Sequence, residues 1–287
     1  MDKLISVITV CYNAEEEIKR TIDSILDQNI PDLEYIVVDG KSSDGTVEYV
    51  TGKRPFFEEK KINFKVISEI DKGIYNAMNK GIDLAEGKWV LFLNAGDVFY
   101  DANVLERVSG FLRNSSDADV VYGDVVLKKG DKYKFEKADY PEKILYQMPF
   151  CHQSSFTKRD VLKEYRFNED YKICADHEMF MRCYRDGKVF RAMPFAVAIY
   201  ELFGKSSEDL SHSFWMERLM IQKESGYISE EEFANKAKEL ENSTRNRKFR
   251  QFIKKLTPGF IIDKRQERID QESGWSTEYP KLTGDGE

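Results

Sequence analysis

Apolar residues in the first hundred positions follow two alternating patterns. Short β-branched or aromatic runs indicate strands buried on both faces, at residues 4–10, 35–38, 64–67 and 89–93. Between these runs, apolar residues three or four positions apart indicate amphipathic helices, at residues 15–26, 44–50 and 74–84. This alternation predicts an α/β fold, with a doubly wound, mainly parallel sheet and helices on both of its faces.

After residue 97 the alternation is less regular. The pattern predicts helices at residues 104–112 and 176–184 and strands at residues 120–127 and 189–200. The charged stretch at residues 128–139 is predicted to form a hairpin. From about residue 206 the chain has a helical pattern that breaks near Gly226 and ends in a polar tail. We therefore divide the chain into residues 1–98, residues 99–205 and a C-terminal helical extension with its tail, residues 206–287.

Composition narrows the function classes. The 287 residues are 41% hydrophobic, which supports a sizeable core, and 44 basic against 51 acidic residues leave a net charge of −7. This acidic balance disfavours nucleic acid as a partner. No apolar run reaches the roughly 18–20 residues of a membrane span, and the first residues lack a signal-peptide pattern. Four widely spaced cysteines without a C-x-x-C pair indicate reduced thiols, so we expect a cytoplasmic protein.

Three of the first four predicted strands are followed closely by an aspartate. These residues are Asp39, Asp71 and Asp97, and Tyr12 and Asn94 also stand just after strands. In an open α/β sheet, ligands bind outside the carboxyl ends of the strands. A single aspartate there is a common turn residue or helix cap, but three at one edge favour a shared binding site.

The chemistry of these residues favours a nucleotide bound through a metal ion. The sequence has neither a G-x-G-x-x-G nor a G-x-x-x-x-G-K-[ST] loop to bring backbone N–H groups against phosphate. Carboxylates at that edge would repel a diphosphate unless a divalent cation, Mg²⁺ or Mn²⁺, lies between them. Asp39 could accept from a base or ribose, Tyr12 could face a nucleobase, and Asn94 and Asp97 could hold the metal. The alternatives are a core position for Tyr12 and turn-forming roles for Asn94 and Asp97.

An ordered series of motifs resembles the GT-A-fold inverting glycosyltransferases of family 2, bacterial enzymes that build cell-surface polysaccharides and decorate teichoic acids. The motifs are SVITVCYNAEEEIKRTIDSILDQ, YIVVDGKSSDGTVEYV, SEIDKGIYNAMNKGIDLAEGKWVLFLNAGD and HQSSF…ADHEMFMRC, between about residues 4 and 205. The resemblance implies that residues 1–98 bind a nucleotide sugar, and that residues 99–205 bind the acceptor and carry the catalytic residues.

The resemblance also implies roles at the nucleotide edge. Tyr12 would flank the uracil of a UDP-sugar, and Asp39 would bind the uracil ring. Asp71 would line the nucleotide pocket, with Lys80 near the phosphates or bonded elsewhere on its helix. The family usually has D-x-D after the fourth strand, whereas this chain has Asn94-Ala95-Gly96-Asp97. Asp97 is therefore the expected metal ligand, and one carboxylate of the pair is replaced by a neutral amide.

Asp176 is the expected catalytic base. Sugar transfer to a hydroxyl needs a group that takes the acceptor proton, and in-line displacement assisted by one base inverts the anomeric carbon. From local sequence alone, Asp176 could equally be a helix N-cap, and the resemblance favours the base. His152 matches a family position near the donor phosphate and acceptor cleft, although a structural histidine is equally open. Lys205 is a candidate for neutralising the departing UDP.

The C-terminal extension contains a basic, amphipathic stretch at residues 245–262. This stretch could lie on an anionic membrane surface, as suits a lipid-linked acceptor, and would then place the enzyme peripherally on the inner face of the membrane. It could equally pack on its own domain or on a second copy in a homo-oligomer.

The leading hypothesis is an inverting glycosyltransferase that moves a sugar from a nucleotide-sugar donor to a hydroxyl of a glycan or lipid-linked acceptor. A sugar-phosphate nucleotidyltransferase would need a glycine-rich basic loop after the first strand, and residues 11–16 do not supply one. A catalytically impaired carbohydrate- or nucleotide-binding module of the same fold is the other alternative, because Asn94 replaces a carboxylate.

Overall fold

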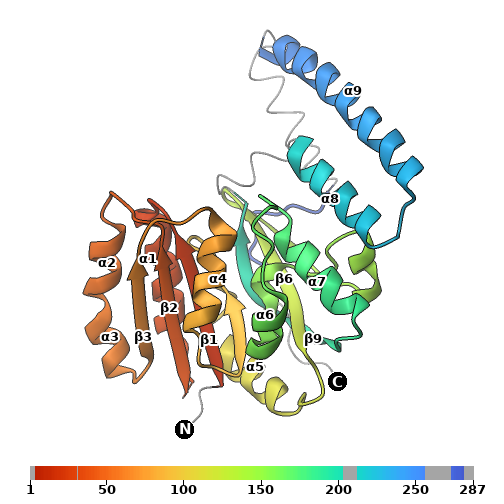
Figure 1. The fold of residues 1–287 in the computed structure, drawn as a ribbon. Coiled ribbons are helices and arrows are strands. Elements are labelled where there is room, and N and C mark those ends of the chain that lie inside the picture. The colour runs from red at the N-terminus through yellow and green to blue at the C-terminus, as the bar shows by residue number, and fades with distance from the viewer. Residues whose placement is uncertain (1–3, 31, 203–211, 256–272, 281–287) are drawn as a thin grey trace.

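The computed structural model describes residues 4–30, 32–202, 212–255 and 273–280, and of residues 243–255 it describes the backbone alone. The first half has the predicted alternation, and adds one short helix, α3, that the hydrophobic pattern does not mark (Figure 1). Its elements are β1 (Ile5–Cys11), α1 (Glu15–Leu26), β2 (Leu33–Asp39), α2 (Thr46–Gly52), α3 (Arg54–Glu59), β3 (Asn63–Ser68), α4 (Ile74–Leu84) and β4 (Trp89–Phe92).

The second half mixes short strands, helices and single helical turns. Its elements are β5 (Val98–Phe99), α5 (Val104–Arg113), β6 (Val120–Lys129), β7 (Lys132–Glu136), η1 (Pro141–Leu145), η2 (His152–Ser154), β8 (Ser155–Lys158), α6 (Arg159–Tyr165), α7 (Ala175–Arg185) and β9 (Phe190–Glu201). The hairpin expected at 128–139 is formed by β6 and β7, which pair antiparallel. The pattern does not mark β5, β8 or α6.

One sheet runs through both halves of the chain, in the order β3-β2-β1-β4-β8-β6-β9-β5, with β7 added beside β6. Strands β3, β2, β1 and β4 are parallel neighbours, which confirms the mainly parallel first half. Strand β8 then pairs antiparallel with both β4 and β6. The carboxyl ends of the four parallel strands therefore meet at one edge, beside the second half of the domain.

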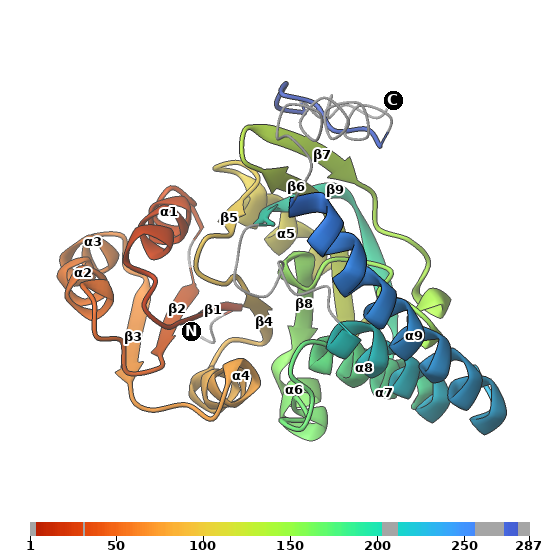
Figure 2. The ribbon, with the colours of Figure 1, turned by 90° about the horizontal axis from the view of Figure 1, so that it is seen from above.

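Helices cover both faces of this sheet, as predicted (Figure 2). Alternate residues of β1 point to opposite faces, so that Ile5 and Val7 pack with α1 and α5, while Ile8 and Val10 pack with α4, α6 and α7. Both sets of side chains are buried, and each forms a separate apolar core. The sheet is therefore the middle layer of three, and its edges are where polar side chains can gather.

Helices α8 (His212–Glu224) and α9 (Glu230–Lys255) form the C-terminal extension, with the expected break at Gly226 between them. Helix α8 packs on α7, and α9 extends beyond the sheet (Figure 1). Among the described residues, no helix is both long and apolar enough to cross a bilayer. Of the basic stretch at 245–262, the backbone of 245–255 is described, as part of α9, and 256–262 lie outside the described residues.

Residues 273–280 return to the second half of the sheet. Ser276 forms an isolated antiparallel bridge with Tyr133 of β7. The Tyr279 ring stacks on Tyr100 at 5.6 Å between centroids, and its hydroxyl donates to the Tyr100 carbonyl at 2.8 Å. This return segment places Trp275 close to the functional cavity described below.

Candidate active site

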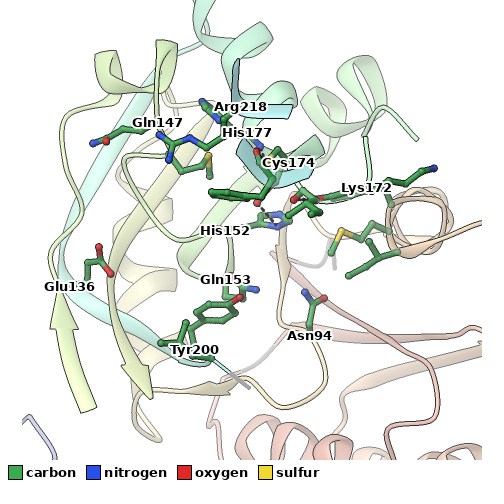
Figure 3. Close-up of a pocket in the computed structure, with 18 of the residues that line it drawn as sticks. Asn94, Glu136, Gln147, His152, Gln153, Lys172, Cys174, His177, Tyr200 and Arg218 are labelled. Atoms are coloured by element: carbon green, nitrogen blue, oxygen red, sulfur yellow. Dashed lines mark hydrogen bonds and ion pairs between the residues drawn. The ribbon is translucent and has the colours of Figure 1, made fainter. Parts of the chain in front are cut away.

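A cavity of about 780 Å³ opens between the end of β4 and the second half of the domain. Its wall includes Asn94 after β4, His152 and Gln153 of η2, and Asp176 at the start of α7. In the view of Figure 3, His152 lies between Asn94 at one end and His177 with Arg218 at the other. The cavity thus brings together three of the residues predicted from sequence: Asn94, His152 and Asp176.

Asp176 lies in the first turn of α7 and faces this cavity. The N-cap position belongs to Cys174, so the alternative of a capping aspartate does not describe Asp176. Its Oδ1 accepts the backbone N–H of His177 at 2.8 Å, and its Oδ2 lies 3.9 Å from His152 Nδ1. Burial raises the pKa of the Asp176 carboxyl above its ordinary value. A carboxylate with a raised pKa in a cavity is suited to accept a proton.

His152 is a neutral, almost fully buried ring. It packs against Phe92, Phe167 and Phe180, with ring centroids 5.3 to 5.9 Å apart. This apolar surrounding lowers the pKa of His152 to about 4 by burial. The imidazole therefore carries no charge at neutral pH, and its aromatic surroundings fix its position beside Asp176.

Two side chains with oxygen atoms, Asn94 and Asp97, follow β4 and differ in how their oxygens are bonded. Asn94 Oδ1 is buried and has no hydrogen-bond partner within the described part of the chain. Asp97 is 4% exposed and accepts the Glu201 N–H at 3.2 Å and a bond from the Gln153 side chain. Burial raises the pKa of the Asp97 carboxyl to about 8. Across the described ranges, no group of three His, Cys, Asp or Glu residues is arranged to hold a metal ion.

Tyr12 and Asp71 form a separate rim at the ends of β1 and β3, outside the cavity wall. A Cβ built on Gly40 would lie 3.1 Å from Asp71 Oδ2 and 3.4 Å from the Tyr12 ring, so Gly40 leaves the two side chains room to approach. Tyr12 is 61% exposed and is not the core residue of the alternative interpretation. Lys80 Nζ bonds Asp71 at 2.6 Å and Glu69 at 2.8 Å, and these bonds raise its pKa.

Asp39 is held almost entirely by the protein. Its carboxylate accepts the Ser42 N–H at 2.9 Å, the Ser42 hydroxyl and the Ser68 hydroxyl at 2.6 Å, and the Cys11 thiol lies 3.7 Å away. A carboxylate has about four lone-pair sites, so a nucleobase N–H would have to displace one of these donors. Asp39 therefore organises the loop after β2 in this structure.

Several residues of the cavity wall were not predicted from sequence. Gln153 adjoins His152 within the HQSSF motif, so its position in that motif was the available signal. Tyr200 is the penultimate residue of strand β9, and Arg218 and Trp275 come from the C-terminal extension. No local pattern marks these three residues, because the fold brings them to the cavity from distant parts of the chain. Lys205 lies outside the described residues.

The sheet, whose first four strands are parallel, has a cavity beyond the carboxyl end of β4, which is where open α/β proteins bind their ligands. The sequence profile described as glycosyl transferase family 2 matches residues 6–186, and the chain belongs to this family. It is therefore a glycosyltransferase.

Two relatives illustrate the family's range. The chain is 33% identical over 218 residues to a PGL/p-HBAD biosynthesis glycosyltransferase of Mycobacterium bovis, covering 75% of this chain and 84% of the relative. It is 29% identical over 234 residues to the amylovoran biosynthesis glycosyltransferase AmsB of Erwinia amylovora, covering 75% and 77%.

Solved structures share the fold. A crystal structure of residues 1–349 of S. aureus TarS in complex with UDP-GlcNAc has a TM-score of 0.63 at 20% identity, covering 83% of this chain and 72% of that one. Another structure of the same TarS fragment is covered over 64% of its length. A mannosyltransferase of Pyrobaculum calidifontis in complex with GDP-Man and Mn²⁺ has a TM-score of 0.60 at 18% identity, covering 79% and 65%.

Proposed function

We propose that the protein is an inverting glycosyltransferase that uses a UDP-sugar and glycosylates a hydroxyl of a glycan or lipid-linked acceptor. The observation that carries this proposal is the position of Asp176, whose carboxyl faces the cavity with a raised pKa beside a neutral histidine. The TarS structure with UDP-GlcNAc supports the choice of nucleotide, and the two biosynthetic relatives support a glycan or glycolipid acceptor.

In the proposed mechanism, the Asp176 carboxylate takes the proton of the acceptor hydroxyl. The oxygen attacks the anomeric carbon as the bond from that carbon to the UDP oxygen breaks, and UDP leaves with the bonding electron pair. Attack opposite to the leaving group inverts the anomeric configuration. The neutral His152 ring leaves the raised pKa of Asp176 in place, because a positive charge at 3.9 Å would lower it.

Asp97 and Asn94 are the proposed oxygen ligands for a divalent cation. They fit because Asn94 Oδ1 has no partner within the described ranges, and because burial raises the pKa of Asp97, so that a cation would stabilise its ionised form. A divalent cation is commonly held by one or two carboxylates with substrate phosphate oxygens and water, so two protein ligands are enough. When bound, the cation would supply positive charge to the diphosphate leaving group.

Tyr12 and Asp71 are proposed to line the nucleoside site, with the exposed Tyr12 ring stacking on the base, and Asp39 is proposed to bind a base N–H in exchange for one of its present donors. Base–aromatic stacking contributes about 1–3 kcal/mol, so Tyr12→Ala is expected to weaken UDP binding by about tenfold. Titration calorimetry with UDP measures the effect. Tyr140→Ala is the matched control, because Tyr140 is 72% exposed and stands before η1 rather than after β1 or β3. Equal UDP affinity in wild type and Tyr12→Ala would contradict the stacking role.

The direct test of the proposed function is UDP release from a panel of UDP-sugars, with and without Mn²⁺, followed by NMR of the product's anomeric proton. We expect release with one or a few donors, stimulation by Mn²⁺ and an inverted product. Nucleotide binding without release from any donor or acceptor would instead support the catalytically impaired binding module. A retained anomeric configuration would refute the mechanism.

A further inference from the structure

Glu217 of α8 binds the loop that leads into the active-site helix. Its carboxylate accepts three consecutive backbone N–H groups: those of Lys172 at 2.8 Å, Ile173 at 3.0 Å and Cys174 at 2.8 Å. Hydrogen bonds from backbone N–H groups to a charged carboxylate are among the stronger ones in proteins. A single side chain of the C-terminal extension thereby fixes three peptide units of the catalytic domain.

These peptide units lie directly before α7, and Cys174 is its N-cap. The first N–H groups of a helix have no partner within the helix, and a capping side chain of the same segment usually satisfies one of them. Here the Cys174 side chain makes no capping hydrogen bond, and Glu217 instead accepts hydrogen bonds from the peptide N–H groups that lead into the helix. The Ile173 peptide is held from its other side as well, because the Tyr75 hydroxyl donates to the Ile173 carbonyl.

We propose that Glu217 is a positioning residue that places Asp176 through the loop before α7 and adds a negative charge to its surroundings, and this inference rests on the proposed role of Asp176 as the base. Asp176 follows Cys174 by two residues, so a shift of the bound loop moves its carboxylate directly. Displacing a reacting group by about 1 Å can cost about a hundredfold in rate. The C-terminal extension is then part of the catalytic apparatus, although it lies outside the residues matched by the family profile.

Glu217 affects Asp176 through its negative charge as well as through the position of the loop that it binds. Burial is the main cause of the raised pKa of Asp176, and the negative charge of Glu217 raises it further. The other titratable groups around Asp176 are Tyr75 of α4, Cys151 and His152 near η2, Cys174, His177 of α7 and Tyr200 of β9, and Arg218 of α8 lines the same cavity. Asp176 acts as a base when ionised, so activity falls as pH decreases through its raised pKa.

Glu217→Gln tests both parts of the inference. The amide removes the negative charge and turns an NH₂ group toward one of the three N–H donors. We expect kcat to fall about 10- to 100-fold with the Kd for UDP unchanged. We also expect the acid limb of kcat/KM to move to lower pH, because the pKa of Asp176 falls when the charge is removed. Hydrogen exchange of peptides covering 171–176 should become faster.

Glu224→Gln is the matched control, because Glu224 is also an α8 carboxylate and its partner is the Tyr171 hydroxyl at 3.0 Å rather than the three amides. We expect its acid limb to coincide with that of the wild type. Glu217→Asp keeps the charge but shortens the side chain, so its kcat should fall while the acid limb of kcat/KM stays at the wild-type pH.

Two results would overturn the inference: wild-type kcat in Glu217→Gln and Glu217→Ala, or equal shifts of the acid limb in Glu217→Gln and Glu224→Gln. Full turnover in Asp176→Asn would instead refute the base assignment. The two failures are therefore distinguishable.

Discussion

Asp176→Asn is expected to bind UDP as the wild type does and to transfer sugar about 10²- to 10⁴-fold more slowly, the contribution typical of a general base. Asparagine has nearly the same shape, and its carbonyl oxygen can still accept the His177 N–H that Asp176 Oδ1 accepts at 2.8 Å. The first turn of α7 should therefore persist, while the amide cannot take a proton from the acceptor. UDP release assays measure turnover, and calorimetry with UDP measures binding.

Asp160→Asn is the control for this substitution. Asp160 lies in the first turn of α6, as Asp176 does in α7, but its side chain is 90% exposed and does not line the cavity. Its replacement should leave turnover unchanged. A fully active Asp176→Asn enzyme would show that another group takes the acceptor proton.

Asp97→Asn is expected to abolish stimulation by Mn²⁺, with a loss of about 3 kcal/mol of transition-state stabilisation, or about a hundredfold in rate. The substitution removes the one carboxylate at the end of β4 while leaving an oxygen that can accept the Glu201 N–H. Turnover after chelator treatment and Mn²⁺ titration measures the effect on activity. Calorimetric titration of Mn²⁺ in the presence of UDP measures binding independently of catalysis.

Asn94→Asp is the informative partner variant, because it restores the second carboxylate of the family's D-x-D pattern at the residue whose side-chain oxygen has no partner among the described residues. We expect it to bind Mn²⁺ more tightly than the wild type. Unchanged Mn²⁺ affinity in both Asp97→Asn and Asn94→Asp would exclude this end of β4 as the metal site.

The first half of the fold could be predicted from sequence because β1, β2 and β4 are largely apolar along their whole length. Strands β1 and β4 are buried on both faces, so their pattern does not depend on knowing their neighbours. Strand β8 has the sequence SFTK, which is short and half polar, and its strand conformation depends on pairing with β4 and β6 on either side. Such tertiary pairing leaves little trace in local sequence.

The residues of the candidate site also include some that could be predicted from sequence and some that could not. The family motifs include Asn94, His152 and Asp176, and the fold brings all three to one cavity. Glu217 could not be predicted, because its proposed role depends on a contact between α8 and a loop 43 to 45 residues away in the chain. The exposed Tyr12 and the enclosed Asp39 also show that the motif marks the place of a residue, while packing decides whether its polar atoms remain available.

The return segment at 273–280 has a consequence for how this enzyme could diversify. Trp275 forms part of the cavity wall although it lies about ninety residues beyond the end of the family match at residue 186. Its segment is attached to Tyr133 and Tyr100 and contributes no strand to the central order of the sheet. Substitutions in this segment can therefore reshape one wall of the cavity without disturbing the sheet that carries Asn94. Under the proposed function, selection could alter the choice of acceptor in the tail while the donor-binding half stays constant.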